Sequence, residues 1–454
     1  MLPFLPIFHL AQATPTPSPT PTPSTEIVQP QQVRAISGNL DNVPVFNSNS
    51  PELVQIEGIL LSTFPPNGKA TPTAHLNFPF QGRFDVFAHH IAKPPTPEDL
   101  RTLYLGIILY NPGTQPVTVD ILQAASYLSQ PDAPFIQLES VVDNPSGTVY
   151  AGPGSRVMSD ILLGRHQSDF PAQLVLPPGQ SQMLLNLPIP VRTLDPPLNG
   201  RSTLIRLRSD GKVYAASLAR YAAVDAQGQE RAPTLEEWQQ LLNNGKLAEP
   251  RDRTPTPPDT NKGQIIYGRV AGVAQGSQWR TQLVDSPNAQ FLSIPQPGQA
   301  FSYGLSTLHG GRMGTGQIQS ARMLVRYPDT AYFAHGNYGV QYSLTLPLIN
   351  PTSETQTVTL AFETPLKEDD PQGKLHFLSP PAKQIFFRGT VQIRYKDDAG
   401  LPRTRIVHLV QRRGQQGEPL VMLKMPPQDT RLLQVDFLYP PDATPPQVLT
   451  LKTL

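Results

Sequence analysis

Proline recurs along the whole chain and restricts what its backbone can form. The sequence has 454 residues, of which 53, about 12 %, are proline, against roughly 5 % in average proteins. Proline breaks helix interiors because it lacks a backbone donor, whereas turns and edge strands accept it. The proline content therefore predicts many short strands joined by turns, which is an all-β fold.

Alternating apolar and polar residues support this prediction on both sides of the chain centre. The alternation is clear over 117–121, 344–348 and 358–363. A period of two places apolar side chains on one face of a strand and polar side chains on the other. These segments are therefore predicted to be half-buried strands.

The segment 235–244 carries the one strong helix signal. Thr234 and Glu237 have the spacing of a capping box, Trp238 lies on the apolar face, and Asn244-Gly245 supplies a stop signal. The sequence predicts one short amphipathic helix here.

A proline-rich polar stretch at 246–262 follows this helix and is typical of an interdomain linker. It divides the chain into a first predicted domain at 26–245, which ends in the helix, and a second at 263–454.

A short internal sequence repeat relates the two halves. Phe-Ala-His occurs at 87–89 and again at 333–335, and in each half an apolar segment ends in Asn-Pro, at Asn111-Pro112 and at Asn350-Pro351. The copies lie about 240 residues apart. Each Asn-Pro is followed by a Thr/Val-rich segment, which is a hairpin signature. The pattern predicts two related immunoglobulin-like β-sandwich domains.

The N-terminus has the features of an exported protein. Residues 1–13 are apolar and end in Ala11-Gln12-Ala13, a pattern typical of signal-peptide cleavage. The usual positive charges are missing, which indicates either a true start upstream of Met1 or an atypical signal. Residues 14–25 form a Thr/Pro spacer. We expect a periplasmic, outer-surface or extracellular location and no membrane span in the mature chain.

Composition and motifs exclude several classes of function. The chain has no cysteine and a formal net charge of +1, which excludes thiol chemistry and makes nucleic acid an unlikely partner. The His-Gly-Gly at 309–311 has no accompanying GXSXG, and the glycine-rich 310–316 lacks the Lys-Ser/Thr of a phosphate loop. No catalytic residue, metal or cofactor is therefore predicted.

One polar cluster is the candidate ligand-binding site: His75, Asp85, His89 and His90. Imidazoles with a carboxylate can hold a metal or exchange protons, but this spacing matches no established metal site. Adjacent His89 and His90 would also point to opposite faces of a strand. His335 occupies the position of the repeat that corresponds to His89. A shared structural hydrogen bond explains a histidine that occurs in both copies more simply than two active sites do.

Three segments carry a resemblance to a known family: LDNVPVFNSNSPELVQIEGILLSTFPP (40–66), AHLNFPFQGRFDVFAHHI (74–91) and EEWQQLLNNGKLAEPRD (236–252). They resemble an uncharacterised family of exported cyanobacterial proteins, a domain-of-unknown-function family. The resemblance implies a bacterial envelope or extracellular setting and no particular reaction.

These features favour a non-enzymatic structural or binding protein of the cell envelope, whose partner is an envelope protein or a surface polysaccharide. The alternative is a glycan-active hydrolase with a pair of carboxylates in the cleft between the two domains.

Overall fold

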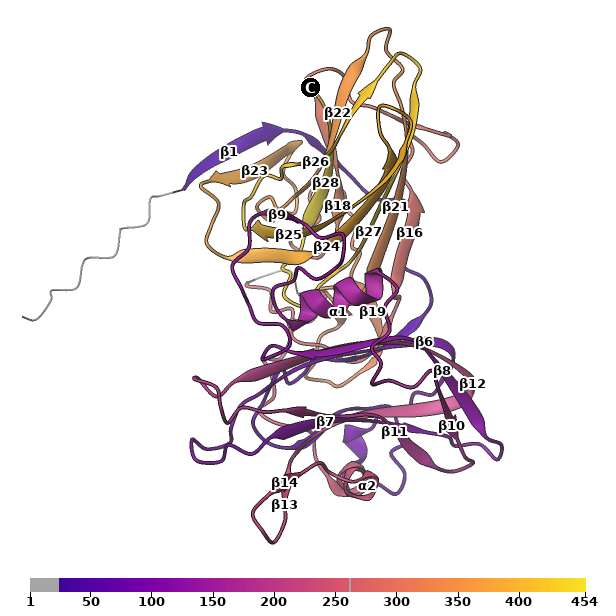
Figure 1. The fold of residues 1–454 in the computed structure, drawn as a ribbon, viewed down its shortest axis with the longest axis vertical. Helices are drawn as coiled ribbons and strands as arrows, with labels where there is room; N and C mark the ends of the chain where they lie inside the picture. Colours follow the sequence, from indigo (N-terminus) through magenta and orange to yellow (C-terminus); the bar gives the residue numbers. More distant parts are fainter. Residues whose placement is uncertain (1–23, 261–262) are drawn as a thin grey trace, which may run out of the picture.

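The computed structural model describes residues 24–260 and 263–454, which form two β-sandwiches stacked along the long axis of the molecule (Figure 1). The predicted signal peptide (1–13) and nearly all of the Thr/Pro spacer (14–25) lie outside the described residues. The prediction of an all-β, sandwich-like fold is confirmed. The narrower immunoglobulin-like assignment stays a prediction.

The first sandwich has an inner sheet, which faces the second sandwich, and an outer sheet. The inner sheet has the order β10-β8-β12-β6-β3-β15-β19-β20, with β4 beside β6, and the outer sheet has the order β11-β7-β12-β5. The strands are β3 (Pro44–Ser48), β4 (Leu53–Val54), β5 (Gly58–Ser62), β6 (Phe80–Ala92), β7 (Leu103–Tyr110), β8 (Val117–Leu128), β10 (Gln173–Leu176), β11 (Ser181–Ile189), β12 (Asn199–Tyr221), β15 (Ala271–Gln275), β19 (Ala321–Arg326) and β20 (Phe333–Ala334).

Strand β12 joins the two layers because it is long enough to belong to both. Its first half, through Ser209, pairs with β6 and β8 of the inner sheet. Its second half, from Tyr214, pairs with β7 and β5 of the outer sheet. The core between the sheets is aliphatic and aromatic, and includes Phe84, Val86 and Ile205.

The second sandwich packs a seven-stranded sheet, with the order β16-β21-β27-β24-β25-β9 and β17 beside β21, on a five-stranded sheet, β2-β18-β28-β22-β26. Two short pairs, β1-β23 and β13-β14, complete the strands. Their bounds are β1 (Thr25–Pro30), β2 (Gln32–Arg34), β9 (Val141–Asp143), β13 (Ala223–Val224), β14 (Glu230–Arg231), β16 (Gln278–Gln282), β17 (Leu292–Ser293), β18 (Ala300–Leu305), β21 (Gln341–Ile349), β22 (Gln356–Glu363), β23 (Lys374–Ser379), β24 (Ile385–Lys396), β25 (Pro402–Arg412), β26 (Pro419–Met425), β27 (Thr430–Leu438) and β28 (Gln447–Thr453).

Helix α2 (Leu235–Asn244) occupies the segment predicted to be helical. The capping box between Thr234 and Glu237 is present. The fully buried Trp238 packs on Gly106 of the outer sheet, where an added Cβ would lie 2.7 Å from the indole ring. The helix thus covers the outer face of the first sandwich (Figure 1).

A second α-helix, α1 (Pro153–Leu162), is present in addition to the predicted one. Its first residues, Pro153, Gly154 and Ser155, are weak helix formers. The helix lies between the sandwiches (Figure 1), where it contacts β8 and β12 on one side and β24 and β27 on the other. Burial on both sides, rather than a local signal, stabilises it. No helix of the described ranges is long and apolar enough to cross a membrane.

Strand pairing crosses the predicted linker at 246–262. Strand β15 continues the inner sheet of the first sandwich by pairing with β3, whereas β2 and β9 pair with strands of the second sandwich. The Tyr327 hydroxyl donates to the Ala74 carbonyl (2.7 Å) and accepts from the Ser62 backbone N–H (3.0 Å). The sheets of both sandwiches therefore contain strands from both sides of 246–262, the segment where the composition becomes proline-rich and polar.

Asn111 and Asn350, the asparagines of the predicted internal repeat, form corresponding side-chain hydrogen bonds. In each, Nδ2 donates to two corresponding carbonyl oxygens and Oδ1 accepts from the backbone N–H two residues later, while Asn350 Nδ2 also lies 3.1 Å from the Pro426 carbonyl oxygen. The partners are Gln115 (2.7 Å), Leu176 (2.9 Å) and Gly113 (2.8 Å) for Asn111, and Glu354 (2.8 Å), Met425 (2.8 Å) and Thr352 (3.0 Å) for Asn350. Both side chains fix the turn that follows an apolar strand.

Replacing either asparagine by alanine is expected to lower the free energy of unfolding by about 2 kcal/mol, because buried carbonyl oxygens lose their donors. N111A and N350A should have similar effects, since the two bond sets match. Urea unfolding measures both, with N288A, at an exposed asparagine, as the control. A loss below about 0.5 kcal/mol at either site, the size of an ordinary surface substitution, would contradict this prediction.

Candidate functional site

The structure separates His75 and His90 from the other two predicted site residues. His90 Nε2 bonds Ser48 Oγ (2.9 Å), and its Nδ1 donates to the Pro51 carbonyl oxygen (2.8 Å). His75 Nδ1 bonds Ser62 Oγ (2.8 Å). Burial lowers the pKa of each imidazole to about 4. Both histidines are therefore neutral at pH 7 and bonded within the first sandwich.

Asp85 and His89 lie on the opposite face of β6 from His90, the face toward the second sandwich. Asp85 is buried and pairs with Arg83 and, at 4.0 Å, with Arg206. Burial raises its pKa in spite of both guanidinium groups. His89 Nδ1 bonds Ser202 Oγ (2.8 Å), and burial lowers its pKa to about 3. The four residues thus do not converge on one point, and no metal-ligating cluster is found in 24–260 or 263–454.

His89 is connected to a cavity through two further side chains. Its Nε2 lies 3.7 Å from Oε1 of Glu52, and Glu52 forms an ion pair with Arg269. Arg269 lines a cavity of about 370 Å³ between the two sandwiches.

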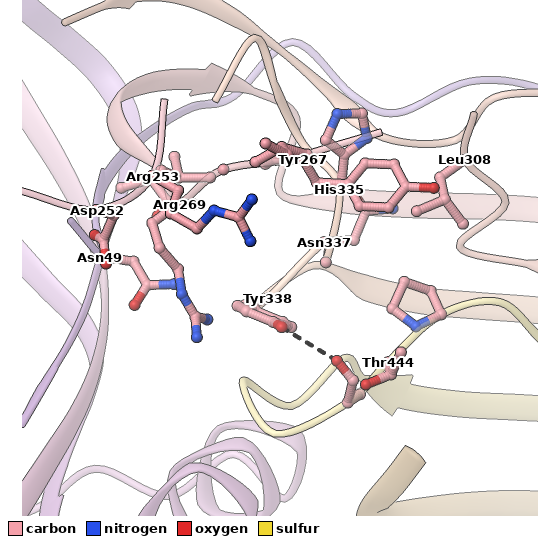
Figure 2. A pocket seen from close by; sticks show the side chains of 18 of the residues that line it. Asn49, Asp252, Arg253, Tyr267, Arg269, Leu308, His335, Asn337, Tyr338 and Thr444 are labelled. Atoms are coloured by element: carbon pink, nitrogen blue, oxygen red, sulfur yellow. Dashed lines mark hydrogen bonds between the residues drawn. The ribbon is translucent and has the colours of Figure 1, made fainter. Parts of the chain in front are cut away.

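Figure 2 shows this cavity, which short segments of both halves enclose. They are the end of β3, residues 252–253 and 266–270, the stretch after β20, and residues 443–445. The guanidinium groups of Arg253 and Arg269 extend into the open centre. Arg253 is exposed and forms no hydrogen bond or ion pair with any part of the chain that the structure describes.

Two asparagines on the cavity wall have unused hydrogen-bonding capacity. Asn47 and Asn49 are 4 % and 2 % exposed, and Oδ1 of each is buried without a partner among the described residues. A buried, unpaired polar atom is destabilising by about 1–3 kcal/mol. Such atoms are retained where a ligand or water satisfies them, so this wall has the character of a binding surface.

A second cavity of about 300 Å³ adjoins the first and shares Ile266, Tyr267 and His335 with it. Its wall is aromatic: the ring centroids of Tyr267 and His335 are 4.8 Å apart, and those of Phe333 and His335 are 5.6 Å apart. His309 and Arg312 also line it. We call the two adjoining cavities the groove.

Two acidic residues lie beside the first cavity. Burial raises the pKa of Glu52, and the charges of Asp252 and Asp442 raise it further, while Arg269 opposes them. Burial likewise raises the pKa of Asp442, against the effect of Arg388. Asp442 Oδ2 is buried without a hydrogen-bond partner in the described ranges. The Tyr338 hydroxyl, on the cavity wall, donates to the carbonyl oxygen of Ala443, the residue after Asp442 (3.1 Å).

Sequence reasoning missed most of the groove. Arg253, Arg269 and Tyr338 come from separate segments, and no motif links them. Two weak signals fell on it: the His-Gly-Gly at 309–311, whose His309 and Gly310 line the second cavity, and the Phe-Ala-His at 333–335, which lines both cavities. Neither motif indicated any chemistry on its own.

The fold and groove define an all-β protein of two interlocked sandwiches with a ligand-sized cleft between them. The chain belongs to the DUF3370 family of proteins of unknown function, whose model matches residues 31–453. No curated protein matches the chain.

Proposed function

We propose that this protein is an exported, non-enzymatic binding protein of a cyanobacterial cell envelope, and that it binds a surface polysaccharide in the groove. The signal-peptide pattern at 1–13 and the Thr/Pro spacer at 14–25 support export and separation from an anchoring surface.

The aromatic and hydrogen-bonding lining of the groove carries this proposal. The apolar faces of sugar rings stack on aromatic side chains, and sugar hydroxyl groups bond amides, carboxylates and guanidinium groups. Tyr267 and Phe333 supply the aromatic faces, while Asn49, Asp252 and Arg253 supply hydrogen-bonding groups. Two adjoining cavities offer space for more than one sugar unit, as a polysaccharide chain requires.

The test is co-sedimentation of the purified protein with insoluble cyanobacterial envelope polysaccharide. R253A is expected to weaken retention about 10- to 100-fold, because one charge-assisted hydrogen bond is worth about 1.5–3 kcal/mol. Stability should not change, since Arg253 is exposed and unbonded within the described ranges.

The matched control is R280A, at an exposed arginine on β16 away from the groove. It should be retained like the unmodified protein. Equal retention of R253A and R280A would refute binding in the groove, and no retention of the unmodified protein would redirect the search to an envelope protein as partner.

Glu52 and Asp442 favour one alternative, a glycan-active hydrolase. Two carboxyl groups with raised pKa values beside a cleft can divide the roles of acid and base. This alternative requires release of reducing sugar into the supernatant, and loss of that release in E52Q and in D442N. Retention without sugar release would favour the binding protein.

A further inference from the structure

The first sandwich contains a third cavity, separate from the groove, with a volume of about 540 Å³. It opens between the inner and outer sheets and is lined by β8, β11 and β12, by Arg156 of α1 and by residues 167–171. It shares no lining residue with either cavity of the groove.

A buried cation lines this cavity. Arg201 of β12 is only 5 % exposed, and burial lowers its pKa to about 10. Nη1 donates to Ser126 Oγ (3.0 Å), and Nη2 donates to the Pro188 carbonyl oxygen (2.8 Å), which are both uncharged acceptors. Across 24–260 and 263–454, no carboxylate lies within ion-pair distance of this guanidinium, although Asp132 acts on its pKa from farther away.

This arrangement is unfavourable without a ligand. Burying a charge is destabilising by several kcal/mol unless an opposite charge compensates it. A guanidinium has five N–H donors, and Nε, Nη1 and Nη2 of Arg201 use one each. The second hydrogen of each Nη remains to form the paired bonds that a carboxylate accepts.

Other groups in the cavity limit the charge of the ligand. Asp132 and Asp169 also line it, and they would repel a dianion such as phosphate. Asn186 of β11 also lines the cavity, but its side chain turns to the α2 side of the outer sheet, where Nδ2 donates to the Pro233 carbonyl oxygen (2.8 Å). Arg156, whose guanidinium lies 3.8 Å from the ring centroid of Tyr127, is a second cation on the cavity wall.

We propose that this cavity binds a small organic carboxylate, which pairs with Arg201 and donates a hydroxyl or ammonium hydrogen to Asp132 or Asp169. A ligand with one carboxylate and a donor group matches the buried cation and the nearby acids. A sugar acid and an amino acid both have these two groups, and the experiment distinguishes them.

Met183 of β11 lines the cavity and provides a reporter in the unmodified protein, because a ligand beside β11 alters the surroundings of this strand although the Met183 side chain packs toward α2. The chain has seven methionines, so methyl-¹³C-methionine NMR spectra are simple, and an M183L variant assigns the resonance. We expect D-glucuronate or L-leucine to shift the Met183 methyl signal saturably. The counterparts that lack the carboxylate, D-glucose and L-leucinamide, should not shift it. Met422, exposed on β26 of the second sandwich, is the internal control.

R201Q is expected to weaken the binding at least 10-fold, whereas R208Q, at an exposed arginine on the same strand, should bind normally. A response to glucuronate alone would identify a sugar acid, and a response to leucine alone an amino acid. The proposal is overturned if neither carboxylate shifts Met183, or if glucose and leucinamide shift it equally. The NMR result on the unmodified protein decides this even if R201Q does not fold, and it does not depend on the outcome for the groove.

Discussion

Acidification from pH 7.5 to pH 5 is expected to remove most of the free energy of unfolding of this protein. Five histidines cause this effect: His75, His89, His90, His335 and His408. Burial lowers the pKa values of His89 and His335 to about 3 and those of the other three to about 4, from an ordinary value of 6.5.

The direction follows from proton binding in the two states. Below pH 6.5 the unfolded chain protonates these histidines, whereas the native protein does not until the pH approaches 3 to 4. Their stabilising contribution is therefore complete above pH 6.5 and is lost as the pH falls. Each histidine accounts for about 1.4 kcal/mol per pH unit, so five remove about 10 kcal/mol by pH 5, compared with about 5–15 kcal/mol for a whole domain.

Four carboxyl groups oppose this loss. Burial raises the pKa values of Glu52, Asp85, Glu363 and Asp442, so the native state takes up protons on these groups before the unfolded chain does. This uptake stabilises the native state as the pH falls through their raised pKa values. It offsets part of the histidine effect at the acidic end of the range.

Urea unfolding followed by tryptophan fluorescence at pH 7.5, 6 and 5 measures the effect. H90Q should reduce the pH dependence by about one fifth, because it removes one of the five imidazoles with a lowered pKa. H166Q, at an exposed histidine, should leave the dependence unchanged. A free energy of unfolding that stays constant between pH 7.5 and pH 5 would show that these histidines are not held neutral by burial.

Local signals were sufficient to predict some elements. The capping box at Thr234 and the apolar face around Trp238 lie within one segment, and α2 has the predicted bounds. The alternation at 117–121, 344–348 and 358–363 falls in β8, β21 and β22. These features depend on residues that are close in the sequence, so no knowledge of the tertiary structure is needed.

Pairing between distant strands was beyond such reasoning. Nothing near Ala271 shows that β15 pairs with β3, more than 200 residues earlier. Helix α1 is stabilised by the sheets on both of its sides, which the sequence around Pro153 does not reveal. The groove could not be predicted from the sequence for the same reason, because its walls come from both halves of the chain. His89 was singled out by composition, but its approach to the groove depends on Glu52 and Arg269.

The interlocked strands lead to a second large expected effect. A chain cut within 257–260 is expected to remain one particle, because strands on each side of the cut complete sheets on the other. Residues 257–260 are exposed, so a protease site inserted after Asp259 should leave the fold intact. Two domains joined only by a linker would separate after the same cut.

Each piece alone would lose part of its core. Without the second piece, β3 loses its neighbour β15, and the Ser62 N–H and Ala74 carbonyl lose the fully buried Tyr327. Loss of a buried aromatic side chain alone is destabilising by about 3–5 kcal/mol. The second piece would in turn lose β2 and β9 from the edges of its sheets.

Size-exclusion chromatography of the cut protein tests this expectation. We expect coelution of both pieces at the volume of the uncut chain, and separation only after urea is added. Either piece produced alone should lack a cooperative unfolding transition. Two separate, cooperatively unfolding pieces in the absence of urea would instead support two independent domains divided at 246–262, and would show that the strands crossing this boundary contribute little to stability.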